Sequence, residues 1–176
     1  QGNALGQVML AMAYLFGWGI EDYDKAQFWL SKAKEQSDPD AQKAVMILSA
    51  EIYRKGLGVK RDLEKAFNLY SKELAEFPDS TDDYELPMLL GMMYHQGHGV
   101  EKDDVKAAEL LAKAAKQAQA KKAWNAQFYV SLEYMAKKQH SKAIEHLTNV
   151  AKMGDADAQF YLGSYYLKGK AVPKSL

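Results

Sequence analysis

The chain of 176 residues contains no cysteine. Disulfide bridges, zinc sites built on thiolates and cysteine nucleophiles are therefore excluded. Proteins without cysteine occur in every compartment, so this absence does not locate the protein.

The chain also lacks an excess of charge of either sign. Lysine and arginine total 23, aspartate and glutamate total 23, and the pI is near 7.1. A nucleic-acid-binding module usually carries a basic excess that displaces counterions from phosphates, so we expect no nucleic-acid partner. Charge is locally uneven: residues 101–152 contain ten lysines against six acids. We favour a solvated outer face as the explanation, over a site for an acidic partner or a membrane surface.

Long apolar runs are missing too. No run approaches the roughly eighteen residues that a membrane span needs, and no signal peptide opens the sequence. We therefore expect a soluble chain that does not insert into a membrane.

Five tyrosines recur in one local pattern, at intervals of 39, 41, 40 and 32 residues: Tyr14, Tyr53, Tyr94, Tyr134 and Tyr166. A small residue stands three positions before each of them: Ala11, Ala50, Gly91, Ser131 and Gly163. A lysine–alanine pair follows each of the first four: Lys25-Ala26, Lys65-Ala66, Lys106-Ala107 and Lys142-Ala143. A period of about 40 residues indicates a repeat array whose members cannot bury their apolar faces alone.

We predict a single repeat domain over residues 1–176, with repeats at approximately 2–37, 38–79, 80–119, 120–153 and 154–176. The last repeat stops where its second helix should start, and we expect exposed apolar surface there unless that end is covered. Because the numbering begins inside a repeat, the chain is compatible with a longer protein that carries further repeats or domains.

Each repeat reads as two helices. The second helix carries apolar residues at i, i+3, i+4 and i+7, which predicts one buried face: Ala26, Trp29, Leu30, Ala33; Ala66, Leu69, Tyr70 and a polar Glu73; Ala107, Leu110, Leu111, Ala114; and Ala143, Leu147, Val150. The first helix is apolar almost all round, so neighbours must cover it on several sides. At Gly91, and five residues before the equivalent small residue in other repeats (Gly6, Ala126, Ala158), we expect an adjacent helix to approach closely.

Gly-x-Gly loops join the two helices at 17–19, 56–58 and 97–99. The first glycine can end a helix in the left-handed conformation, while Asp62 and Asp103 can cap the next helix. The connector of the fourth repeat, residues 136–141, contains no glycine. The loops lack the strand and the lysine of a phosphate cradle, so we interpret them as structural turns.

The third repeat resembles a Sel-one-like repeat (SLR), the longer relative of the tetratricopeptide repeat. The similarity is carried by Leu90-Gly91, Tyr94, Gly97-x-Gly99-Val100, Asp103, Lys106-Ala107 and Lys113-Ala114-Ala115. The fifth repeat shows the first half of the same pattern in residues 154–169, and the fourth resembles a plain tetratricopeptide repeat. The resemblance implies an all-α, right-handed solenoid of antiparallel helix pairs, with about nine helices here. It also implies a role as an adaptor between proteins, often in bacterial envelopes or in secretion, so a periplasmic or secreted location is suspected without excluding the cytoplasm. A cysteine-rich branch of the family is linked to penicillin binding. We do not expect that activity here, because this chain lacks the cysteines that characterise the branch.

In tetratricopeptide-like repeats the concave face of the first helix is formed by residues six and two before the tyrosine and one after it. These positions predict a protein-binding groove formed by Val8, Met12, Leu15, Ile47, Glu51, Arg54, Met88, Met92, His95, Phe128, Leu132, Met135, Phe160, Ser164 and Leu167. Side chains rich in Met, Leu and Phe suit an adaptable surface for a helix or an extended peptide. An equally weighted alternative is that they fill a tightly wound superhelix.

Catalytic and metal chemistry receive little support. His95 and His98 lie three residues apart near Glu101 and Asp103, but two imidazoles without a third firm ligand are weak evidence for zinc. His140 and His146 have no nucleophile or carboxylate at a useful spacing, and we assign them surface or packing roles. We therefore predict a non-enzymatic scaffold without cofactor or metal, which binds a peptide or protein segment in the groove. The alternative is an inhibitor or immunity-type protein that docks onto one bacterial effector or enzyme.

Overall fold

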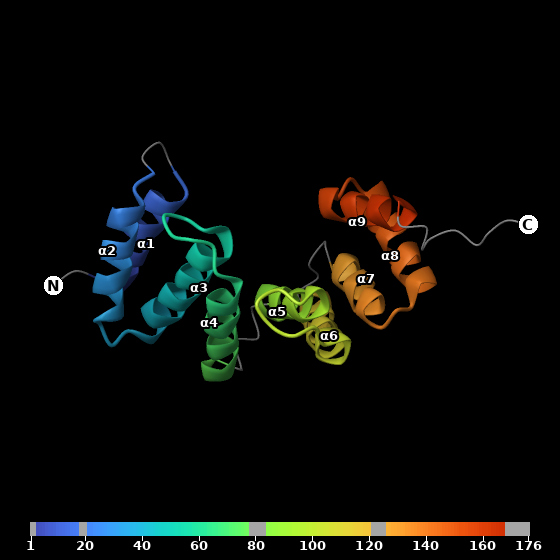
Figure 1. The fold of residues 1–176 in the computed structure, drawn as a ribbon, viewed down its shortest axis with the longest axis horizontal. Helices are drawn as coiled ribbons and strands as arrows, with labels where there is room; N and C mark the ends of the chain where they lie inside the picture. The colour runs from blue at the N-terminus through green and yellow to red at the C-terminus, as the bar shows by residue number, and fades with distance from the viewer. Residues whose placement is uncertain (1–2, 18–20, 78–83, 121–125, 168–176) are drawn as a thin grey trace, which may run out of the picture. The chain divides into compact units, whose positions relative to one another are not determined.

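The computed structural model describes residues 3–17, 21–77, 84–120 and 126–167, and in these ranges it contains nine α-helices and no strand (Figure 1). The helices are α1 (Ala4–Leu15), α2 (Tyr23–Lys34), α3 (Pro39–Lys55), α4 (Leu63–Glu76), α5 (Glu85–Gln96), α6 (Asp104–Ala120), α7 (Ala126–Ala136), α8 (His140–Lys152) and α9 (Ala156–Leu167). The predicted all-α fold of helix pairs is confirmed.

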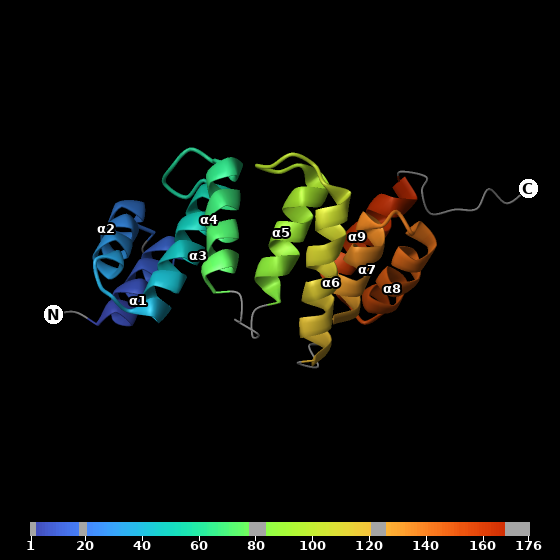
Figure 2. The same ribbon diagram turned by 90° about the horizontal axis from the view of Figure 1, so that it is seen from below.

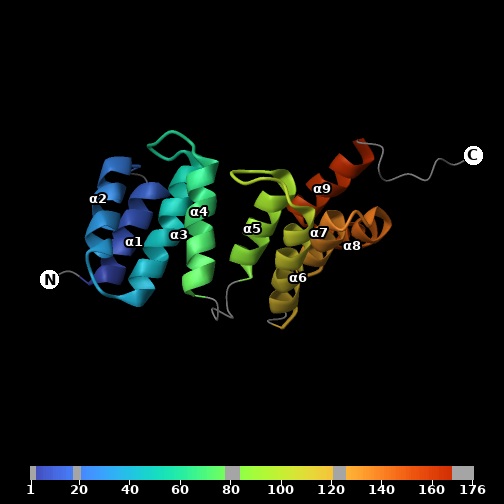
Figure 3. The same ribbon diagram turned by 60° about the horizontal axis from the view of Figure 1, so that its bottom comes forward.

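The chain forms two compact units, Gln1–Pro78 and Asp79–Leu176, called here the N-terminal and C-terminal halves. In the N-terminal half α1 packs on α2, α2 on α3 and α3 on α4. In the C-terminal half α5 packs on α6, and α7, α8 and α9 follow in the same sequential manner (Figures 2 and 3). The assignment of all 176 residues to a single repeat domain stays a prediction.

Local side-chain chemistry sets the ends of the helices. Asp62 caps α4 by accepting a hydrogen bond from the Lys65 N–H at 2.9 Å, and Asp103 accepts from the Lys106 N–H at 3.0 Å. Gly56 and Gly97 follow α3 and α5 with φ of 75° and 71°, the left-handed region in which a Cβ is disfavoured. Both predicted caps are confirmed. The left-handed conformation predicted for the first glycine of each loop is confirmed for all three, since Gly17 has a φ of 62°. Residues 18–20 of the first Gly-x-Gly loop lie outside the described residues.

The lysine–alanine pairs hold the two helices of a repeat together. The four alanines are completely buried: Ala26, Ala66, Ala107 and Ala143. The four lysines lie over the tyrosine rings of their own repeats, with Nζ 5.1–5.5 Å from the ring centroids: Lys25 on Tyr14, Lys65 on Tyr53, Lys106 on Tyr94 and Lys142 on Tyr134. The sequence pattern that defines the period is therefore a repeated cation–π contact beside a buried methyl group.

The predicted buried faces of the second helices are mostly confirmed. Ala33, Leu111, Leu147 and Val150 are buried, and Glu73 is buried 4.0 Å from the Lys43 ammonium. The prediction was wrong for three larger side chains, which remain partly exposed because they lie at the margin of the buried face: Trp29, Leu69 and Leu110.

The close approach predicted at small residues occurs at Gly91. A Cβ at this position would lie 2.8 Å from Leu111 Cγ and 3.1 Å from the Ala107 carbonyl oxygen, both on α6. The same prediction was wrong for Gly6, where the nearest described atoms belong to its own capping residue, Asn3, at 3.8 Å or more.

Candidate binding site

In the N-terminal half the predicted groove residues separate into core and surface. Val8 and Leu15 are 3% and 2% exposed and belong to the core that α1, α2 and α3 form. Met12 is exposed and Ile47 is half-buried. Val8 and Leu15 therefore match the packing alternative, since their side chains are inside the half and cannot contact a partner.

The polar groove residues of this half bind each other. The Arg54 guanidinium donates to both carboxylate oxygens of Glu51, at 2.8 and 2.7 Å, and the Tyr70 hydroxyl donates to Glu51 Oε1 at 2.5 Å. Partial burial disfavours the charge on Glu51, but the hydrogen bonds from Arg54 and Tyr70 outweigh it and lower the pKa of this carboxyl to about 2. This network links α3 to α4 through the bond from Tyr70 to Glu51. The charged groups of Glu51 and Arg54 are paired with each other rather than directed at a partner.

In the C-terminal half, two further groove residues belong to the core and two lie on open surface. Phe128 and Leu132 are buried in the core cluster, so they too match the packing alternative. Met88 is partly buried against the same cluster. Phe160 and Leu167 are 73% and 90% exposed on α9, which gives the apolar surface expected in the fifth repeat.

The remaining four predicted residues line one pocket of about 360 Å³: Met92, His95, Met135 and Ser164. They come from the first helices of three successive repeats, α5, α7 and α9. The other lining residues were not predicted: Gln96, Lys102, Asp104, Lys138, His140, Tyr161 and Tyr165. We call this cavity the α5–α9 pocket.

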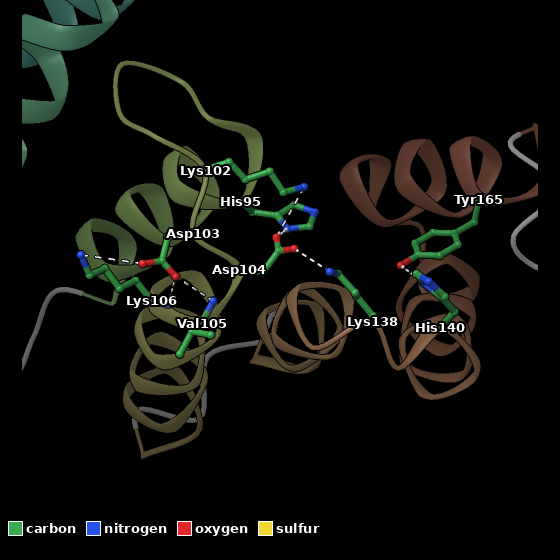
Figure 4. Close-up of polar contacts among 9 residues, drawn as sticks. All are labelled: His95, Lys102, Asp103, Asp104, Val105, Lys106, Lys138, His140 and Tyr165. Carbon is green, nitrogen blue, oxygen red and sulfur yellow. Dashed lines mark hydrogen bonds and ion pairs between the residues drawn. The ribbon is translucent and has the colours of Figure 1, made fainter.

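A charged network forms one wall of the α5–α9 pocket (Figure 4). Asp104, the first residue of α6, accepts from His95 Nδ1 at 2.9 Å and lies 3.5 Å from Lys102 Nζ and 3.2 Å from Lys138 Nζ. Desolvation opposes the charge of the Asp104 carboxylate, but the bonds from Lys138 and His95 prevail and lower its pKa. The network therefore contains an ionised carboxylate that orients two ammonium groups from two different connectors.

The opposite wall carries His140 and Tyr165, whose Nδ1 and hydroxyl are 3.2 Å apart (Figure 4). Burial raises the pKa of Tyr165, so its hydroxyl stays protonated at neutral pH. The sequence predicted a surface or packing role for His140, and in the structure its ring packs against that of Tyr165 and lines the pocket. The walls combine these polar groups with the methionines, which is typical of sites that orient a ligand by a few polar contacts.

Sequence reasoning missed the pocket residues that do not lie on the predicted stripes. Lys102 and Lys138 lie in connectors, and Asp104 begins a second helix, whereas the groove prediction considered first helices alone. One signal was available, because Lys102 and Lys138 both belong to the lysine-rich region 101–152 that we interpreted as a solvated face.

The described part of the chain offers no group of three or more His, Asp or Glu side chains placed to hold a metal ion. His95 binds Asp104, and His98 is exposed on the connector. Within the same described ranges, none of the helices combines the length and the apolar character that crossing a bilayer requires.

The repeated helix pairs, with their buried alanines and tyrosine–lysine contacts, define an α-helical repeat protein. The Sel1 repeat matches residues 4–38, 42–72, 88–118 and 156–176, which together exceed half of the chain. The chain therefore belongs to the Sel1 repeat family. The fourth repeat, which resembled a plain tetratricopeptide repeat, lies outside the four matched segments.

Two solved structures share this fold. One is c5321, described as a protective antigen present in uropathogenic Escherichia coli strains and displaying an SLR fold; it is 29% identical, with a TM-score of 0.63, over 96% of this chain and 34% of its own length. The other is a Sel1 repeat protein from Oxalobacter formigenes, 23% identical with a TM-score of 0.61, over 97% of this chain and 67% of its own. The chain thus spans about a third of the length of c5321.

Proposed function

We propose that this chain is a non-enzymatic interaction scaffold that binds a peptide segment of another protein in the α5–α9 pocket. The observation that carries the proposal is that predicted groove residues from separate repeats meet at one cavity. Met92, Met135 and Ser164, on three successive first helices, line the same cavity. Membership of a family of repeat scaffolds is consistent with this role.

The cavity is better suited to binding a peptide side chain than to a reaction that requires an enclosed site. Methionine side chains adapt to apolar groups of different shape, and the polar groups at the walls can bind a peptide backbone. Both imidazoles of the described lining are engaged within the protein, since His140 contacts the Tyr165 hydroxyl and His95 contacts Asp104.

The proposal is tested by selecting phage-displayed random dodecapeptides on the purified chain and measuring the affinity of the synthetic peptides by fluorescence anisotropy. We expect Met92→Glu with Met135→Glu to weaken binding at least about tenfold, because the apolar contacts are replaced by buried charge. Met153→Glu is the matched control, since Met153 is 74% exposed and outside the pocket.

A second variant guards against a folding defect in the double mutant. Ser164→Phe fills the pocket from a partly exposed position, and Asn149→Phe adds the same ring to the exposed surface of α8. Retention of peptide binding by both pocket variants, with unchanged circular dichroism, would contradict the proposed site.

A further inference from the structure

The two lysines of the α5–α9 pocket are its most accessible charges. The side chains of Lys102 and Lys138 are 56% and 72% exposed, whereas the Asp104 side chain that both contact is 19% exposed. An anion that approaches the pocket therefore meets the ammonium groups before it meets the carboxylate.

The charge of the described lining residues is unbalanced. Lys102 and Lys138 face one carboxylate, that of Asp104, so the lining keeps a positive charge even with both histidines neutral. Each ammonium group has three N–H donors. Asp104 can hold both lysines in place while they retain donors for a second acceptor.

Lys138 has an unusual backbone. Its φ is 58°, and no other non-glycine residue in the described ranges has a positive φ. In the second and third repeats the left-handed residue after the first helix is a glycine, Gly56 or Gly97. A side chain at such a position is disfavoured relative to glycine, because its Cβ crowds the following carbonyl oxygen. The lysine at this point therefore stands against the preference of the backbone, which points to a use for its side chain.

We infer that the α5–α9 pocket selects peptide segments that present a carboxylate, bound by the ammonium groups of Lys102 and Lys138 beside the apolar surface of Met92 and Met135. The inference rests on the proposed function and specifies the chemistry of the partner. An acidic side chain and the free carboxylate at the end of a chain share this chemistry. The lysines of region 101–152 then include a site for an acidic partner as well as a solvated face.

The Lys138→Gly variant distinguishes a loss of peptide binding from a loss of folding stability. Glycine removes the ammonium group and accepts the left-handed backbone without strain, so the variant should be at least as stable as the wild type. We expect its affinity for acidic peptides to fall several-fold, and that of the Lys102→Gln, Lys138→Gln double variant to fall on the order of tenfold. The matched control is Lys113→Gln with Lys116→Gln, two exposed lysines of α6 outside the pocket.

The experiment selects random dodecapeptides on the full chain from two phage libraries, one displaying a free C-terminus and one displaying a fused, internal segment. If the pocket binds acidic side chains, we expect enrichment of Asp and Glu in the internal library. If it binds a terminal carboxylate, we expect the other library to yield peptides that need their free C-terminus. The affinity of the synthetic peptides should fall with rising NaCl and with Glu→Gln exchange in the peptide.

Three outcomes would overturn the inference. Selection of neutral peptides that depend on Met92 and Met135 but not on the two lysines would refute carboxylate binding and leave the proposed pocket intact. Selection of no peptide would refute both. Stronger binding of phosphoserine peptides than of their glutamate counterparts, with displacement by inorganic phosphate, would assign the lysines to a phosphate instead.

Discussion

Leu111 of α6 occupies the space that a side chain at Gly91 of α5 would need. The distance from an ideal Cβ at position 91 to Leu111 Cγ is 2.8 Å, which is shorter than ordinary contacts between carbon atoms. The Ala107 carbonyl oxygen, at 3.1 Å, closes the same space with backbone that cannot rotate away. The absence of a side chain at position 91 therefore sets the distance between α5 and α6.

Gly91→Leu should overpack this contact and lower the free energy of unfolding by about 1–3 kcal/mol. The measurement is urea denaturation of the chain followed by far-UV circular dichroism. An unchanged midpoint would show that α5 and α6 can separate at little cost.

Gly163→Ala provides the matched control for the small-residue position. Gly163 holds the same place relative to its tyrosine, but no described atom lies within 4 Å of its ideal Cβ. Because alanine favours a helix over glycine, we expect stability to rise by up to about 1 kcal/mol. Gly91→Ala should show no such gain.

The contact of Lys142 with Tyr134 is the simplest of the four lysine–tyrosine pairs to test. In the first three repeats the lysine also lies near the capping aspartate, as Lys106 does near Asp103 at 3.7 Å. The fourth repeat has Gln139 at the cap position. We expect Lys142→Met to lower the free energy of unfolding by about 0.5–1 kcal/mol, measured by urea denaturation.

A double-mutant cycle with Tyr134→Leu isolates the pair from other changes. The cycle is informative because Tyr134 also stacks on His146, with ring centroids 5.3 Å apart, and this stacking is lost equally with or without Lys142. A coupling energy near zero would mean that the recurring lysine acts through helix propensity alone.

The repeat fold followed from the sequence because its determinants are local. A small residue stands three positions before each tyrosine, and a lysine–alanine pair follows each of the first four tyrosines. In the structure these pairs supply a lysine–tyrosine contact and a buried methyl group. Asp62, Asp103, Gly56 and Gly97 were predicted from capping and turn chemistry that depends on a few neighbouring residues.

The binding site was predictable only in part because it depends on packing between repeats. A stripe read from spacing cannot tell that Leu132 belongs to the core while the partly buried Met135 lines a pocket, since both lie on the predicted face of one helix. The pairing of Asp104 with Lys138 joins residues 34 positions apart through α6 and the α7–α8 connector. No local pattern in the sequence encodes that contact.

The fourth repeat offers a stabilising substitution. Gln139 precedes α8 and makes no side-chain hydrogen bond to the first turn, whereas Asp62 caps α4 in the equivalent place. Gln139→Asp should raise the free energy of unfolding by about 0.5–1 kcal/mol, because a carboxylate accepts from the free N–H groups and opposes the helix dipole. Gln139→Asn keeps a capping oxygen without charge, and equal gains from both variants would show that the dipole contributes little.

Acid should destabilise the N-terminal half through Glu51. Its pKa of about 2 is below the ordinary value of 4.5, so the unfolded chain takes up the proton first and the stability from this group is lost as pH falls from about 4.5 to about 2. The loss is on the order of 2–3 kcal/mol at full protonation. Glu51→Gln should therefore be less stable than the wild type near neutral pH and should lose less stability over this pH range, as measured by urea denaturation at a series of pH values. Glu64→Gln, at an exposed position in the first turn of α4, is the control. A wild-type profile that stays parallel to that of Glu51→Gln across the acid range would contradict the assigned network with Arg54 and Tyr70.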